Sequence, residues 1–142
     1  MSETGLENFD RTLHKTNDWL NDIGDAIGPD KQRQFHALRS VLWALRDRLM
    51  IEEAFHLASH LPTLVRGIFW EDYRPAGKPD VFRSREEFLQ RVSGALEGAP
   101  PMDPEEAARA VFAAMDRHVS GGEMEQVIHL VPEEVRELFP QR

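Results

Sequence analysis

The chain of 142 residues contains no cysteine, which excludes disulfide bonds, thiolate metal sites and cysteine nucleophiles together. No apolar run approaches the roughly 20 residues that a membrane-spanning helix needs. Basic residues are also scarce, because 17 Lys and Arg stand against 25 Asp and Glu and give a net charge of −8. Nucleic acids and anionic membranes bind basic patches, so we expect neither as a partner.

Strand patterns and targeting signals are missing as well. No segment alternates between apolar and polar residues over a useful length, so the sequence predicts no β-strands. The first residues lack the basic and apolar regions of a secretory signal, and we therefore expect a cytoplasmic location. Apolar residues nevertheless make up 41% of the chain, which is enough for a buried core in one domain over residues 1–142.

An internal repeat with an offset of 70 positions relates residues 38–69 to residues 108–139. Apolar positions coincide along both copies, as expected for a duplicated structural unit. A residue type present in both copies favours a structural role, and one present in a single copy is a functional candidate. The identical pairs are Arg39/Arg109, Val41/Val111, Ala44/Ala114, Glu53/Glu123, Pro62/Pro132, Val65/Val135, Arg66/Arg136 and Phe69/Phe139.

Helical periodicity and capping residues divide each copy into two longer and two shorter helices. Ser84 is typical of a helix cap, and so are Ser120 and Asp103, the latter with Pro104 behind it. In the first copy we expect helices over about 6–27, 30–49 and 52–60, and a further helix from 62. The sequence thus predicts an all-α fold of about eight helices, as two pseudo-symmetric four-helix repeats (about 4–70 and 84–140) joined by a linker over 71–83.

Several segments resemble a known protein family. They are Phe9–Leu13, Thr16–Leu20, His36–Leu49, Glu53–Leu57, Leu61–Gly67 and Gly77–Pro79. Together they resemble a prokaryotic family known as domain of unknown function 2267. The resemblance covers nearly the whole chain and implies a soluble helical domain. It implies no activity, cofactor or catalytic residue.

One helix face carries a possible ligand set for a metal. Glu52, His56 and His60 are spaced at i, i+4 and i+8, and a carboxylate with two imidazoles suits zinc or iron. The ordinary interpretation is a partly exposed amphipathic helix, because histidine is often intermediate in burial. We therefore predict no cofactor and keep this set as an alternative. The equivalent positions of the second copy are Gly122, Gln126 and Leu130, which could not form a second site.

Apolar residues found in one copy only indicate an interface. Trp43, Met50, Ile51 and Phe55 lie off the main apolar face of their helices. Such a surface is covered either by the chain's own N-terminal and linker apolar residues or by a second protein chain. We take it as the candidate interface. The second copy has Ala113, Ser120, Gly121 and Glu125 at these positions.

The linker borders the expected cleft between the repeats, where ligand sites are common. Trp70, Tyr73 and Arg74 with nearby Arg66 are the candidate wall of that cleft, and the alternative is a linker that simply packs down. Arg66 also has a structural interpretation, because with Arg136 it would complement the dipole in the last turn of a short helix. The neighbours Arg46 and Asp47 are interpreted as an ordinary solvated ion pair.

No nucleophile with a matching base can be assembled from the sequence. The leading hypothesis is therefore a non-enzymatic helical binding or interaction module that self-associates or binds a protein partner. The alternative is a metal- or small-ligand-binding helical protein, with metal-assisted hydrolysis as its possible chemistry.

Overall fold

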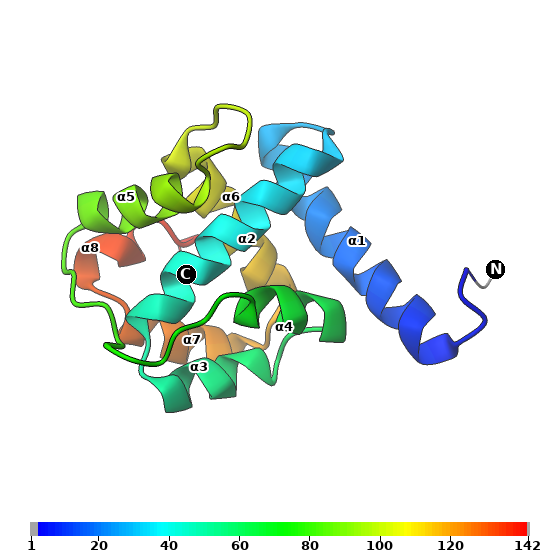
Figure 1. Ribbon diagram of the computed structural model, residues 1–142, viewed down its shortest axis with the longest axis horizontal. Helices are drawn as coiled ribbons and strands as arrows, with labels where there is room; N and C mark the ends of the chain where they lie inside the picture. The colour runs from blue at the N-terminus through cyan, green and yellow to red at the C-terminus, as the bar shows by residue number, and fades with distance from the viewer. Residues whose placement is uncertain (1–2, 142) are drawn as a thin grey trace.

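A computed structural model describes residues 3–141, and these residues form eight α-helices and no β-strand, as the sequence predicts. Helix α2 crosses the middle of the molecule, and the N-terminal half of α1 extends away from the body (Figure 1). None of the described helices is long and apolar enough to cross a membrane. The helices are α1 (Glu7–Ile27), α2 (Lys31–Arg48), α3 (Ile51–Ala58), α4 (Thr63–Trp70), α5 (Arg85–Ala95), α6 (Pro104–His118), α7 (Gly121–Leu130) and α8 (Glu133–Arg136).

The core lies between α2 and α6, with α1 and α5 packed against both of them. Leu38 and Leu45 on α2 are fully buried, and so is Phe112 on α6, because the apolar residues recur at helical spacing. The ring of Phe112 stacks on Phe139 with centroids 3.8 Å apart, and this contact ties the C-terminal segment to the core.

The predicted caps form at three helix starts. The Ser84 hydroxyl accepts a hydrogen bond from the Glu87 amide at 3.1 Å. The Asp103 carboxylate caps α6, and the Ser120 hydroxyl accepts from the Glu123 amide at 3.4 Å to cap α7. Pro62 precedes the first residue of α4 rather than occupying it. Helix α3 is shorter than predicted, so His60 lies in the turn after it.

The linker over 71–83 is held against the C-terminal end of α2. Arg46 is only 2% exposed, and its guanidinium donates to the carbonyl oxygens of Phe69 at 2.7 Å and Glu71 at 2.6 Å. The prediction of a solvated Arg46–Asp47 pair is therefore wrong for Arg46. Periodicity could not reveal this, because the carbonyl acceptors come from a segment that is distant in sequence.

Arg66 and Arg136 play matching structural roles, although not through the predicted last-turn position. Only Arg136 lies in the last turn of its helix, whereas Arg66 lies in the middle of α4. Both guanidinium groups instead donate to carbonyl groups at or just after the C-terminal end of the preceding helix. Arg66 donates to Ala58 and Leu61 at 3.0 and 2.9 Å, and Arg136 to Val131 and His129 at 3.3 and 3.1 Å.

Candidate functional site

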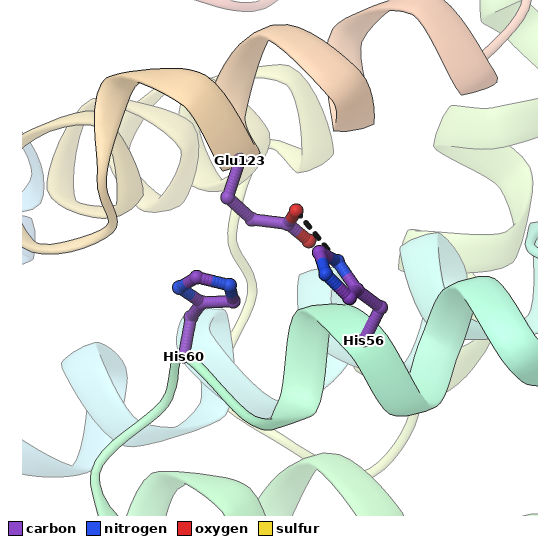
Figure 2. Close-up of side chains that lie close together, drawn as sticks. All are labelled: His56, His60 and Glu123. Carbon is purple, nitrogen blue, oxygen red and sulfur yellow. Dashed lines mark ion pairs between the residues drawn. The ribbon is translucent and has the colours of Figure 1, made fainter.

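Two histidines and a glutamate meet between α3 and α7. His56 projects from α3, His60 from the turn that follows, and Glu123 from the first turn of α7 (Figure 2). One ligand atom from each lies within 4.8 Å of the others. We call these three residues the His–His–Glu cluster.

Local structure fixes both histidines. The Glu53 carboxylate accepts from the Met50 amide at 2.8 Å and holds the start of α3. At the other end, the His60 amide donates to the Leu57 carbonyl at 2.9 Å and continues the helical turn. The spacing of four residues therefore places the two rings on one side, with centroids 5.4 Å apart.

Glu123 is an unusually buried acid. Its side chain is 3% exposed, whereas that of His56 is 58% exposed. His56 Nδ1 approaches Glu123 Oε1 at 2.8 Å, but the ring nitrogen is not aligned for a hydrogen bond and no other donor reaches this oxygen. A buried carboxylate oxygen without an aligned donor is costly, and a positive charge close to it offsets that cost.

The spacing of the cluster is compatible with one shared metal ion. In tetrahedral geometry, two ligand atoms that each lie about 2.0–2.2 Å from an ion are roughly 3.3–3.6 Å apart. The present separations, all within 4.8 Å, would reach that value by rotation of side chains, and both imidazoles are exposed. A shared ion would also satisfy Glu123 Oε1 without requiring His56 to aim at that oxygen.

Of the predicted ligand set, the structure brings His56 and His60 together, while Glu52 is not part of the cluster. Glu52 lines an adjacent hollow of about 410 Å³ that His56 and Glu123 also line. Glu123 was not predicted from the sequence as a member of this cluster. Its identity with Glu53 in the repeat was visible, but that signal indicates a helix cap rather than a metal ligand.

The interface candidates divide into two groups. Trp43 is half-buried, because its indole nitrogen donates to the Ile68 carbonyl at 2.9 Å and the guanidinium of Arg46 lies 5.6 Å from its ring. Its neighbours remain at the surface: Met50, Ile51 and Phe55 are 52%, 40% and 58% exposed.

The chain's own apolar residues cover this surface only in part. Trp70 packs against Phe55 with ring centroids 4.6 Å apart. Leu6 and Phe9 of the N-terminal segment, which could have covered it, are themselves 54% and 57% exposed. Met50 and Ile51 thus keep 52% and 40% of their surface exposed in the single chain.

The four residues predicted to line a cleft do not line one common hollow. Tyr73 lies between Trp70 and the guanidinium of Arg46, at 5.1 Å from each. Arg74 is exposed on the linker. Arg66 instead lines a hollow of about 660 Å³ between α1 and the turn from α3 to α4, and Trp70, Tyr73 and Arg74 are not among its lining residues.

The sequence of this chain matches one family of proteins. A family model described as "Uncharacterized conserved protein (DUF2267)" matches residues 16–138. None of the curated proteins compared with the chain matches it.

Proposed function

Because the chain belongs to the DUF2267 family, which is described only as uncharacterised, we propose a function from the geometry of its side chains. The protein is a helical domain that binds one divalent transition-metal ion through His56, His60 and Glu123. This differs from the predicted alternative in its acidic ligand, because Glu123 from α7 takes the place of Glu52.

The observation that supports this proposal is the buried Glu123 carboxylate beside two imidazoles. Its oxygen Oε1 has no aligned donor, and all three donor groups converge within 4.8 Å. The hollow beside the cluster is also lined by Glu52 and Glu53, so the local charge attracts cations.

The chemistry of the ligands favours zinc or iron(II). Two imidazole nitrogens and one carboxylate form the protein part of many catalytic zinc sites, and the same set binds non-haem iron(II). Hard cations such as magnesium prefer oxygen ligands and are disfavoured. Three protein ligands leave at least one position open for water or another small ligand.

Isothermal titration of zinc into chelator-treated, tag-free protein tests the proposal. We expect one zinc per chain for the wild type. Removal of a direct ligand in His56→Ala, His60→Ala or Glu123→Gln is expected to weaken the affinity at least about 100-fold, the upper range seen when only a supporting residue is lost.

Matched substitutions at exposed residues control for nonspecific effects. His14→Ala and Glu125→Gln change the same residue types outside the cluster, and zinc affinity is expected to remain that of the wild type. Equal zinc affinity in His56→Ala and His14→Ala would rule the site out.

Self-association is the second candidate function. It is supported by the adjacent Met50, Ile51 and Phe55 at the start of α3, whose exposure between 40% and 58% is high for large apolar side chains. In this proposal a second copy of the chain covers them.

A further inference from the structure

The hollow that Arg66 lines lies beside the His–His–Glu cluster and shares His60 with it. One face of α1 forms a wall, with Arg11 and Lys15 at helical spacing, and the turn after α3 forms the opposite wall. His60 belongs both to this wall and to the cluster. We call this space of about 660 Å³ the α1 hollow.

Among the residues that line the α1 hollow, basic side chains outnumber acidic ones, although the chain as a whole is acidic. Arg11, Lys15 and Arg66 line it against a single carboxylate, Asp18, whereas the whole chain has a net charge of −8. Two further acids act at its edge. Glu7 pairs with Arg11 at 2.9 Å on the exposed side, and Asp22 pairs with His118 at 2.6 Å.

Several hydrogen-bond donors in the α1 hollow remain available. Lys15 is exposed and has no hydrogen bond or ion pair within residues 3–141. Arg66 uses its Nε and one Nη on carbonyl groups, which leaves N–H groups of the other Nη. The α1 wall is anchored, because the Thr12 hydroxyl accepts from the Leu64 amide at 2.9 Å.

We propose that the α1 hollow binds a phosphate monoester whose phosphoryl group lies near His60. This inference rests on the proposed metal site, because the cation held by His60 adds its charge to those of Lys15, Arg11 and Arg66. A phosphoryl group carries nearly two negative charges and three acceptor oxygens, which suits several cations with free N–H donors. The volume accommodates a small organic ester.

Titration of phenyl phosphate into the zinc-loaded full chain at low ionic strength tests this inference. We expect binding of phenyl phosphate and none of phenol, which shares the ring but lacks the phosphoryl group. Lys15→Gln and Arg11→Gln are each expected to weaken binding about tenfold, as typical for loss of one charged hydrogen bond. Arg83→Gln, an exposed control on the linker, should bind like the wild type.

The same samples test the metal site and the α1 hollow site separately. Zinc binding without phenyl phosphate binding, or equal phenyl phosphate affinity in Lys15→Gln and wild type, overturns the α1 hollow site and leaves the metal site standing. Failure to bind zinc overturns the metal site, and the metal-assisted phosphate site with it. Binding that needs zinc and weakens in Lys15→Gln but not in Arg83→Gln supports both.

Discussion

At the scale of single residues, Glu53 and Glu123 occupy equivalent positions of the two repeats but make different contacts. They are equivalent in the repeat, but Glu53 closes a capping box with the Met50 amide at 2.8 Å, whereas Glu123 turns its Oε1 toward His56. The spacing of His56 and His60 could be predicted from the sequence because both lie on one helical segment. The glutamate could not, because its proximity arises from tertiary packing of α7 against α3.

Replacing Glu123 with an apolar residue of similar size tests whether Glu123 is a metal ligand or a structural partner of His56. In the presence of chelator, we expect Glu123→Met to leave the free energy of unfolding unchanged or to raise it, since burial of a poorly satisfied carboxylate is costly. Urea unfolding measures this. The same variant should fail to bind zinc. A loss of about 3 kcal/mol or more, typical of a broken buried ion pair, would instead show that Glu123 stabilises the fold through His56.

At the scale of helices, Arg85 joins three elements. Its guanidinium at the start of α5 contacts Glu105 on α6 at 2.6 Å and Glu137, which follows α8, at 3.1 Å. The hydrogen bond from Arg85, followed by that from Arg109, lowers the pKa of Glu105 from its ordinary value of 4.5. These groups are partly exposed to solvent, so their contribution to stability is small.

The lowered pKa of Glu105 gives this contribution a defined pH dependence. It is fully present above the ordinary pKa of 4.5 and is lost as pH falls through the lower pKa of the folded state. We expect wild type to be slightly more stable than Arg85→Gln at pH 7, and the difference to shrink below pH 4.5. Urea unfolding at several pH values tests this, with Arg83→Gln as the control. A difference independent of pH would contradict the assignment.

Helices and caps were predictable because both depend on residues that are close together in the sequence. Ser84, Asp103 and Ser120 begin helices as expected, since a side-chain acceptor needs only the amide groups of the next turn. Arg46 was not predictable. Its burial depends on carbonyl groups of Phe69 and Glu71 that the folded linker brings to α2. The pseudo-symmetry of the two repeats remains a prediction.

At the scale of the whole molecule, the N-terminal half of α1 extends away from the body (Figure 1), and the start of α3 carries exposed apolar side chains. Met50, Ile51 and Phe55 lie together at the start of α3, whereas Phe9, although 57% exposed, lies on the N-terminal half of α1. Surface clusters mark interfaces more often than single apolar residues do.

Substitution of a single aromatic residue tests self-association. If a second copy covers this surface, Phe55→Glu introduces two like charges into a two-fold interface, and light scattering should show the mass falling from dimer to monomer. Phe9→Glu, at an equally exposed phenylalanine on α1, should leave the mass unchanged. Trp43→Glu is a poorer test, because Trp43 donates to the Ile68 carbonyl and its loss would perturb the fold. A wild type that is monomeric at high concentration would contradict self-association.

The metal site is tested most directly by the histidine side chains themselves. The chain has six histidines, and long-range ¹H–¹⁵N spectra follow each imidazole separately during a zinc titration. A site formed by the His–His–Glu cluster requires that the ring nitrogens of His56 and His60 shift together and saturate at one zinc per chain, while His14, His36 and His129 stay unchanged. Zinc that shifts other histidines first, or none of them, would contradict the metal site.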